Sequence, residues 1–478
     1  MKSYPVLLAL LLIVLPVTAQ QSALEKLLAD SVMKYASVSF AVRDCDEGKV
    51  ITEAGGLRSL TQASVLKLVT TAAAVELLGP DYTFTTRLGY AGILDKKKGV
   101  LTGDIVVTGG GDPALGSENF KDHYGNVIKR FADDIYGAGI RKVKGRIIVC
   151  TGRYKGQAVN GGWLWEDIGN YYGAGPSGLS FMDNTVKIHF KTGNEGTVPV
   201  LTATEPAEPG ISYITSLRSS GADDMGYVYS APGADKGLIT GTIPTGQDDF
   251  ILKASMPDPA KILAGMLSSE LSARGIKLQQ RDVLINERDT TLTGFKEFSK
   301  IESPRLADLI IVLNNKSVNL YAEHLLRELG LKFTGEGSTE SGLSIINNFL
   351  DSLGIETHGA FIADGSGLSP HNSINSAMLS DLLFRMKKQG RHFNEFYASL
   401  PEGGKTGTLK THFTDPVFES ALRAKSGSMT RVRSYAGYLT GKSGNSYAFS
   451  IIINNFEGSS SVIINLIENL LKEFIINH

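Results

Sequence analysis

The sequence has very few cysteines. Cys45 and Cys150 are the only two in 478 residues, and 104 positions separate them. Small secreted scaffolds that depend on disulfides carry a dense, even set of cysteines, which excludes that class here. We expect both residues to be free thiols. The fold must then rest on a packed core, for which a content of 42% hydrophobic residues is ordinary.

The sequence also lacks an excess of charge of either sign. Lys and Arg number 48 against 49 Asp and Glu, for a formal net charge of −1. Without basic runs, neither a nucleic-acid partner nor a membrane-surface partner is expected. The eight histidines form no His-Glu-x-x-His motif, and Gly-x-Ser-x-Gly is absent, so zinc-peptidase and α/β-hydrolase chemistry find no support. We expect no metal and no other cofactor.

Long apolar runs are scarce as well. The one near the N-terminus spans residues 6–17, follows Lys2, and is followed by the small residues Thr18 and Ala19. This pattern is typical of a secretory signal peptide over residues 1–19, cleaved near Ala19. The run is too short for a comfortable membrane span, so no transmembrane anchor is expected. The mature protein is predicted to be exported to the periplasm.

What the sequence does contain is a hydroxyl and an amine three positions apart. Ser64 and Lys67 lie where an apolar helical segment begins, and Gly79-Pro80 is a stop signal for that helix. Positions i and i+3 share one helix face, so the Lys67 amine can reach the Ser64 oxygen. A partly desolvated lysine can take the proton of a serine nucleophile. Alone, Ser-x-x-Lys is a weak signal, because many helices carry it by chance.

The remaining pattern predicts a catalytic domain interrupted by inserted material. Helices are expected over residues 23–35, 117–137, 259–275, 305–313, 320–329, 342–353, 376–388 and 461–476. A hairpin is expected over 37–53, and terminal strands over 434–440 and 446–454. Short strands are expected in the insertion over residues 85–91, 103–108, 144–150, 185–190, 197–203, 210–215, 226–229 and 250–254.

Two further groups could complete a serine–lysine site. Ser317 and Asn319 precede a predicted helix and offer a proton-relaying hydroxyl and an amide. A third motif must lie on a strand beside the cleft, with a lysine, a hydroxyl and a glycine in sequence. The literal Lys-Thr-Gly begins at Lys405 but lies in a glycine-rich stretch typical of a loop. Lys425, followed by Ser426-Gly427-Ser428, precedes two predicted strands and is the preferred candidate.

Six ordered blocks of the sequence together resemble the low-molecular-mass, class C penicillin-binding proteins, which are D-alanyl-D-alanine carboxypeptidase/endopeptidases of the penicillin-binding protein 4 type. The blocks lie at residues 63–70, 109–113, 165–174, 317–323, 364–369 and 423–428. The resemblance implies an α/β (α+β) fold, in which a transpeptidase-like domain holds an antiparallel sheet flanked by helices. It also implies two smaller β-rich domains inserted between the first and second motifs. We expect the catalytic domain at 20–85 and 296–478, and the insertion at 86–295, divided into 86–170 with 250–295 and 171–249.

The resemblance also implies roles for the motif residues. Ser64, Lys67 and Ser317 are expected to be catalytic, and Asn319 with residues 425–428 to bind substrate, with the Ser428 N–H holding the oxyanion. Asp167 is a candidate contact for the end of a substrate side chain. The expected partners are peptidoglycan stem peptides and their cross-links, with β-lactam antibiotics as covalent inhibitors of Ser64.

Two alternatives stay open at this stage. One is a β-lactamase of the same fold, although the separation of 253 positions from Ser64 to Ser317 favours the form with a large insertion. The other is a non-catalytic relative that binds the cell wall. Two departures from the family pattern are Lys-Ser-Gly in place of Lys-Thr-Gly, and Pro370 where arginine is frequent. Since serine keeps the hydroxyl, we expect activity to survive.

Overall fold

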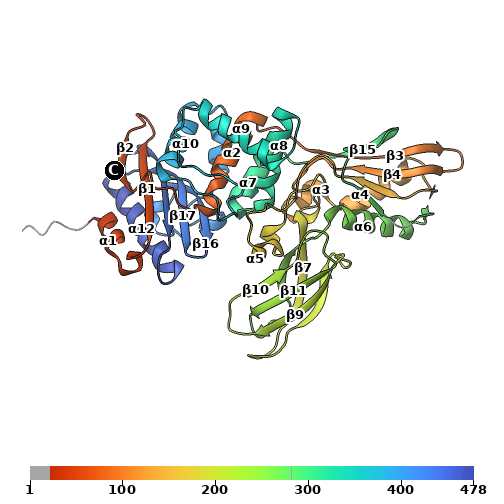
Figure 1. Cartoon of the computed structure of the whole chain (residues 1–478), viewed down its shortest axis with the longest axis horizontal. Coiled ribbons are helices and arrows are strands. Elements are labelled where there is room, and N and C mark those ends of the chain that lie inside the picture. The colour runs from red at the N-terminus through yellow and green to blue at the C-terminus, as the bar shows by residue number, and fades with distance from the viewer. Residues whose placement is uncertain (1–21, 281–282) are drawn as a thin grey trace, which may run out of the picture.

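The computed structural model describes residues 22–280 and 283–478. The predicted signal peptide therefore lies outside the described residues. Figure 1 shows a sheet with many helices at one end, a second sheet at the other end, and a third, β-rich part that projects from the middle. Among the described residues, none of the helices combines the length and apolar character needed to cross a membrane.

The first sheet joins the two ends of the chain. It is antiparallel and runs in the order β16 (Leu422–Met429), β17 (Val432–Thr440), β18 (Ser446–Asn454), β1 (Ser37–Asp44) and β2 (Val50–Ala54). The helices α1 (Ala23–Ala29) and α12 (Ser460–Asn477) share a buried core with its strands, while α10 (Ser376–Gln389) packs on β1, β17 and β18. The predicted α/β fold with an antiparallel sheet flanked by helices is confirmed.

Helix α2 (Lys67–Leu78) is the centre of the helical layer. Residues 67–76 are all buried in succession, which requires neighbours on every side. Those neighbours include α7 (Leu306–Lys316), α8 (Asn319–Thr334), α9 (Thr339–Ser352) and α11 (Phe393–Ala398). Each fully buried Leu or Val contributes about 1.5–3 kcal/mol, so the start of α2 is fixed in the molecule.

The second sheet belongs to the insertion and has seven strands. They are β3 (Thr85–Asp95), β4 (Val100–Thr108), β5 (Lys142–Val143), β6 (Ile147–Cys150), β13 (Lys277–Leu278), β14 (Val283–Asn286) and β15 (Phe295–Glu302). The apolar faces of α4 (Val127–Gly137) and α6 (Pro259–Ala273) pack against it. Backbone hydrogen bonds from Ser303 to Phe84 (2.9 Å) and from Leu306 to Tyr82 (2.8 Å) hold the entry and exit of the insertion together.

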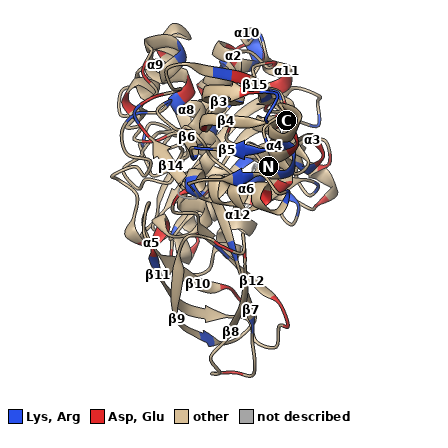
Figure 2. Cartoon of the chain, turned by 90° about the vertical axis from the view of Figure 1, so that its right-hand side faces the viewer, with Lys and Arg blue, Asp and Glu red and all other residues tan. Residues whose placement is uncertain are grey.

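The projecting part consists of two three-stranded sheets around a small apolar core. One has the order β12 (Phe250–Ser255), β7 (Thr185–Lys191), β8 (Val200–Glu205), and the other β10 (Met225–Tyr229), β11 (Lys236–Ile243), β9 (Ser212–Ser219). The sequence pattern does not predict β11, because Gly237 and Gly241 interrupt its apolar alternation. Figure 2 shows acidic and basic residues interspersed along the chain, in keeping with the balanced net charge.

Two predicted helices are wrong in extent. The helix expected over residues 23–35 ends at Ala29, because the Asp30 side chain accepts from the Val32 N–H and starts a separate 3₁₀ turn. The helix expected over 117–137 is divided between α3 (Lys121–Tyr124) and α4 by Gly125, whose φ of 57° is not helical. Cys45 and Cys150 are free, as expected, and both are buried.

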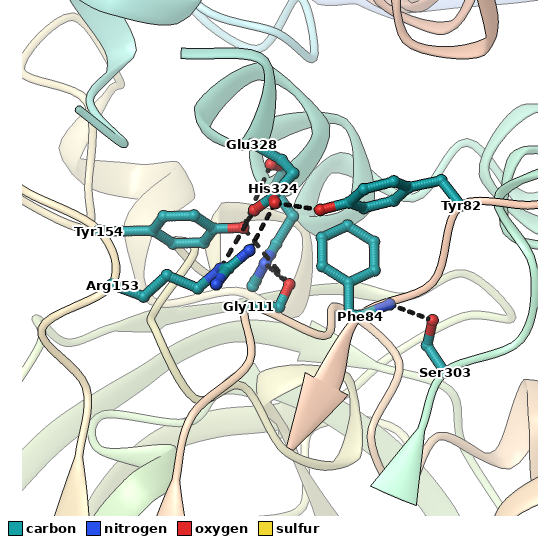
Figure 3. Close-up of polar contacts among 8 residues, drawn as sticks. All are labelled: Tyr82, Phe84, Gly111, Arg153, Tyr154, Ser303, His324 and Glu328. Carbon is teal, nitrogen blue, oxygen red and sulfur yellow. Dashed lines mark hydrogen bonds and ion pairs between the residues drawn. The ribbon is translucent and has the colours of Figure 1, made fainter. Parts of the chain in front are cut away.

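A buried polar cluster fastens the insertion to α8 (Figure 3). The Glu328 carboxylate of α8 accepts from Arg153 Nη2 at 2.5 Å, from the Tyr154 hydroxyl at 3.1 Å, and from the Tyr82 hydroxyl. His324, one turn earlier, has its Nδ1 2.8 Å from the Gly111 carbonyl oxygen. Burial lowers the pKa of His324 to about 3, so this imidazole is neutral. The cluster joins two segments of the insertion, at Gly111 and at Arg153-Tyr154, and the entry to the insertion at Tyr82, to the helix that begins at Asn319.

We expect Glu328→Ala to destabilise the protein by about 3 kcal/mol, because it leaves Arg153 and the hydroxyls of Tyr82 and Tyr154 without their shared acceptor. Urea unfolding followed by tryptophan fluorescence measures this loss. The control is Glu336→Ala, which removes an exposed carboxylate just beyond the end of α8 and is expected to stay within about 0.5 kcal/mol of the wild type. Equal stability of the two variants would contradict the role of the cluster.

Candidate active site

Ser64 lies at a constrained entry to the central helix. A 3₁₀ turn (Ala63–Leu66) runs directly into α2, and Ala63 has a φ of 51°, which is uncommon for a residue other than glycine. The preceding Gln62 carbonyl accepts from the Ser434 hydroxyl of β17 at 2.6 Å. Such backbone strain persists only where the surroundings enforce it. The surrounding contacts therefore fix Ser64 at the start of α2, on the edge of a cavity.

The Lys67 amine has three partners within hydrogen-bonding distance. Its Nζ lies 2.8 Å from Ser64 Oγ, 2.6 Å from Asn319 Oδ1 and 2.7 Å from the Ser366 carbonyl oxygen. The side chain is fully buried. The helical spacing thus brings the amine to the serine, as the i to i+3 pattern predicts, and two other segments complete its surroundings.

Burial lowers the pKa of Lys67 to about 7, against the opposing charges of Asp364 and Glu323, which raise it. An amine removed from water loses the solvation of its charged form, so the neutral form gains. Near neutral pH a large fraction of Lys67 is therefore unprotonated and able to accept a proton.

A pH dependence follows from this pKa. The rate of acylation at Ser64 is expected to fall about tenfold per pH unit below pH 7, because the pKa is lowered and the base form is lost as Lys67 binds its proton. Above pH 7 the rate should level off. Rates of labelling with a fluorescent penicillin between pH 5 and 9 measure the profile. A lysine with the ordinary pKa near 10.5 would instead give a rate still rising at pH 9.

The second motif lies between α7 and α8. Ser317 adopts a left-handed conformation (φ 57°, ψ 40°) that ends α7, and Asn319 is the first residue of α8. The Asn319 amide is used on both sides: Oδ1 accepts from Lys67, and Nδ2 donates to the Tyr172 carbonyl at 2.8 Å. The turn therefore presents one hydroxyl and one amide toward the residues of the first motif.

The third group comes from strand β16. Lys425 is fully buried and its Nζ donates to Ser317 Oγ at 2.9 Å and to the Ser426 carbonyl at 2.7 Å. Burial, with a smaller effect from the charge of Lys67, holds the pKa of Lys425 well below its usual range. Lys405 lies in a loop instead, exposed and paired with Glu402 at 3.2 Å. Ser426, Gly427 and Ser428 continue β16.

Gly427 lies where β16 passes close to the backbone of Ser64. A Cβ atom on it would lie 2.3 Å from Ser434 Oγ, 2.7 Å from the Gln62 carbonyl oxygen and 3.0 Å from the Ser64 nitrogen. Real Cβ contacts are not this short, and the Gln62 oxygen is backbone that cannot turn away. The strand therefore approaches the serine only because residue 427 has no side chain.

We expect Gly427→Ala to reduce acylation at least a hundredfold, because β16 must move away from Ser64 and a misplacement of about 1 Å has that effect. The second-order rate of penicillin labelling measures it. Gly444→Ala is a control in the turn between β17 and β18, where a Cβ would meet nothing within 4 Å. That residue has a φ of 87°, so its change costs about 1 kcal/mol of stability and leaves the rate unchanged. Equal rates for the two variants would contradict the argument.

Each of the three motifs contributes at least one residue to the lining of a single cavity of about 1190 Å³, although the buried Lys67 and Lys425 do not line it. Its lining includes Ser64, Ser317, Asn319, Ser428 and, from the insertion, Asp167 and Tyr172. Burial raises the pKa of Asp167, although a hydrogen bond from the Tyr172 hydroxyl opposes the shift. The structure thus brings the sequence-predicted Asp167 to the same cavity as Ser64, on the wall that the insertion supplies.

Several residues of the site do not follow from the motifs alone. Glu323 and Asp364 flank Lys67 electrostatically, the Ser366 carbonyl contacts its amine, and the Thr408 hydroxyl accepts from Ser426 Oγ at 2.7 Å. Glu323 lies inside the block at 317–323, and Asp364 and Ser366 lie inside the block at 364–369. For Glu323, the available signal was an acidic residue among apolar positions of a predicted helix. Thr408 follows the literal Lys-Thr-Gly and carries no signal of its own.

The described part of the chain, residues 22–280 and 283–478, contains no group of three or more His, Cys, Asp or Glu side chains arranged to hold a metal ion. Around Ser64 the polar groups of the first two motifs are hydroxyls, an amine and an amide, which are donors and acceptors for organic substrates. The chemistry that they support is acyl transfer through a serine.

The fold and this arrangement of a serine, two buried lysines and a Ser-x-Asn turn define the class of penicillin-recognising serine enzymes. Within that class, the sequence profile of the D-Ala-D-Ala carboxypeptidase 3 (S13) family matches residues 20–471. The chain belongs to this family. The prediction from the six blocks, of the family and with it of a serine-type carboxypeptidase, is therefore confirmed.

Individual relatives agree with this assignment. The chain is similar to a D-alanyl-D-alanine carboxypeptidase of Actinomadura sp., with 25% identity over 94% of this chain and 83% of that protein. The crystal structure of penicillin-binding protein 4 from Haemophilus influenzae has 22% identity and a TM-score of 0.79, covering 92% and 97% of the two chains. A peptidoglycan endopeptidase from Bdellovibrio bacteriovorus, at 15% identity and a TM-score of 0.52 over 91% and 92%, shares the fold.

Proposed function

We propose that this protein is a serine-type D-Ala-D-Ala carboxypeptidase, with endopeptidase activity, that acts on peptidoglycan stem peptides through an acyl-enzyme on Ser64. The observation that carries the proposal is the buried Lys67 amine, 2.8 Å from Ser64 Oγ and with a pKa lowered to about 7. A serine next to a neutral amine is an activated nucleophile. Family membership supplies the class of substrate.

In the first half-reaction, Lys67 takes the Ser64 proton as Ser64 Oγ attacks the carbonyl carbon of the penultimate D-alanine. The tetrahedral oxyanion then lies between the N–H groups of Ser64 and Ser428, at the start of α2, where the helix dipole favours negative charge. The close passage of β16 at Gly427 supports this geometry, because it brings the two backbone segments together.

The leaving group needs a proton, which we assign to the path through Ser317. Its hydroxyl accepts from Lys425 Nζ at 2.9 Å, so a proton lost by Ser317 to the departing D-alanine amine is replaced from a lysine. A substrate carboxylate beside Lys425 and Ser426 favours the ammonium form of Lys425, opposing the effect of burial. Water then attacks the ester on Ser64; its proton passes through Ser317 to Lys425, and Lys67 returns its proton to the departing Ser64 Oγ, which regenerates the enzyme.

The wall supplied by the insertion is proposed to bind the rest of the stem peptide. Asp167 and Tyr172 face the cavity, and Asn319 connects that wall to Lys67 through the Tyr172 carbonyl. Asn319 Nδ2 has a second hydrogen for a substrate carbonyl. A cavity of about 1190 Å³ is larger than a dipeptide needs, which supports endopeptidase action on cross-linked peptides.

The cell-wall substrate and the predicted signal peptide support an exported, periplasmic protein. β-Lactams are proposed to acylate Ser64 as substrate analogues; the Haemophilus influenzae relative has also been solved as a complex with a β-lactam. We further propose that the seven-stranded sheet forms one inserted domain and the two three-stranded sheets another. The catalytic domain then resumes after β15, at about residue 303 rather than the expected 296, and β12 falls in the second inserted domain rather than the first.

The test uses labelled penicillin and a muropeptide that ends in D-Ala-D-Ala. Label is expected on the peptide that contains Ser64, Ser64→Ala is expected to take up none, and D-alanine is expected to be released. Label on Ser64→Ala would overturn the assignment of the nucleophile. Release of the label within seconds, without release of D-alanine from the muropeptide, would identify a β-lactamase instead. Absence of both label and hydrolysis would indicate a non-catalytic relative.

A further inference from the structure

A buried carboxylate that the proposed mechanism does not use lies beside Lys67. Glu323 is on α8, one helical turn beyond Asn319, and is 2% exposed. Its Oε1 accepts from the Gly365 N–H at 3.0 Å and from the Ser366 N–H at 2.8 Å. Burying a carboxylate is costly unless hydrogen bonds to it replace those lost from water. Here it fixes a loop whose next carbonyl contacts Lys67.

Asp364 holds the following peptide group of the same loop. The Gly367 N–H donates to Asp364 Oδ1 at 2.8 Å, and the same peptide group carries the Ser366 carbonyl that accepts from Lys67 at 2.7 Å. Asp364 itself is anchored by Trp163 Nε1 and by the Ser369 N–H, at 2.9 and 2.7 Å. Two carboxylates thus fix three successive N–H groups and the direction of one carbonyl.

The direction of the Ser366 carbonyl matters because a neutral amine has a fixed number of hydrogen-bond donors and acceptors. Neutral Lys67 has two N–H donors and one lone pair. Asn319 Oδ1 and the Ser366 carbonyl oxygen are both acceptors, so together they occupy both donors. The lone pair is left for the third neighbour, Ser64 Oγ, at 2.8 Å. The Ser366 carbonyl therefore aims the base at the nucleophile.

The same carboxylates oppose the effect of burial on Lys67. Both of their charges raise the pKa of Lys67, which desolvation would otherwise lower below about 7. Burial and the nearby Asp364 in turn raise the pKa of Glu323 to about 7, while the two N–H groups and Arg327 lower it. The other ionisable side chain that interacts with Lys67 is Lys425 on β16, whose pKa is lowered by burial and, to a smaller extent, by the charge of Lys67.

We propose that Glu323 is a positioning residue for Lys67, which aims its lone pair through the Ser366 carbonyl and stabilises the ammonium that forms when Ser64 is deprotonated. The inference rests on the proposed function, since it assigns Lys67 the role of base. Glu323 contacts neither Ser64 nor the Lys67 amine directly, and it acts through the loop and through its charge.

Glu323→Gln isolates the charge, because its carboxamide oxygen can still accept from Gly365 and Ser366. The acid limb of the acylation profile is expected to move about one unit toward lower pH, since an opposing charge at this range shifts a pKa by about that much. The plateau is expected to fall about tenfold, because a weaker base is a poorer catalyst. Glu323→Asp keeps the negative charge, but its shorter side chain moves the accepting oxygen away from the Gly365 and Ser366 N–H groups. The acid limb of its acylation profile should therefore stay in place while the plateau rate falls.

Glu328→Gln is the matched control on the same helix. Its carboxylate is equally buried but faces Arg153 and Tyr154 in the insertion, so the pH profile of its acylation should coincide with that of the wild type. All rates are measured with labelled penicillin and divided by the fraction of enzyme that can be labelled, so that a loss of folded protein does not lower the measured rate.

A Glu323→Gln profile that coincides with the wild-type profile overturns the proposal, as does a fall in rate with no shift of the limb. If Glu323→Gln yields no folded enzyme, Glu323→Asp decides: a shifted limb in that variant overturns the proposal, and an unshifted limb with a lower plateau supports it. Failure of the proposed function is seen separately, as absence of label on wild-type Ser64.

Discussion

Lys67→Met is expected to reduce acylation of Ser64 by about 10³–10⁴-fold, which is the upper part of the range for loss of a general base. Methionine fills the buried space of the lysine and adapts to irregular surroundings, so the fold should persist. The variant keeps the hydroxyl of Ser64 and removes only the amine that lies 2.8 Å from it. The second-order rate of labelling with fluorescent penicillin at pH 8 measures the loss.

The matched control for this experiment is Lys410→Met, which makes the same change at an exposed lysine and is expected to label at the wild-type rate. Thermal unfolding of both variants shows whether the fold persists. If Lys67→Met labels within tenfold of the wild type, another group takes the Ser64 proton and the role given to Lys67 is wrong.

Lys425→Met and Lys405→Met separate the two candidates for the third motif. The first removes a buried amine that donates to Ser317 at 2.9 Å, and about a 10³-fold loss of kcat/KM on a D-Ala-D-Ala muropeptide is expected. The second removes an exposed amine whose salt bridge to Glu402 is worth at most about 1 kcal/mol, and about a twofold change is expected.

Release of D-alanine, followed at several muropeptide concentrations, gives kcat and KM for each variant. Because Lys425 is proposed to bind the substrate carboxylate, KM should rise as well as kcat fall. The reverse ranking of the two variants would move the third motif to Lys405 and would contradict the strand-borne site.

The sequence predicts much of this architecture because its strongest signals are local. The spacing of Ser64 and Lys67, the apolar helices and the terminal strands follow from periodicity within single elements. The weaker points also have local causes: Gly125 divides a predicted helix, and the glycines of β11 hide a strand. The choice of Lys425 over Lys405 depended on expecting a strand, and β16 is where the structure places Lys425.

What could not be predicted is set by contacts between distant segments. The Ser366 carbonyl, Glu323 and Asp364 surround Lys67 only after α2, α8 and the loop before α10 are packed together. The pKa of a buried amine depends on all charges around it, whatever their separation in sequence. A motif can therefore identify the base without showing what makes it basic at neutral pH.

The attachment of the insertion bears on how such an enzyme can be divided. Its entry and exit run side by side, with Ser303 hydrogen-bonded to Phe84 and Leu306 to Tyr82, so a short linker could replace everything between them without disturbing the chain path. The obstacle is energetic, since excision would expose α8 around Glu328 and would remove Arg153 and Tyr154, two of the three partners of its carboxylate. The chain path would thus allow the catalytic part to be separated, but the separated part would be unstable. A minimal enzyme cut from this chain would need a redesigned face on α8.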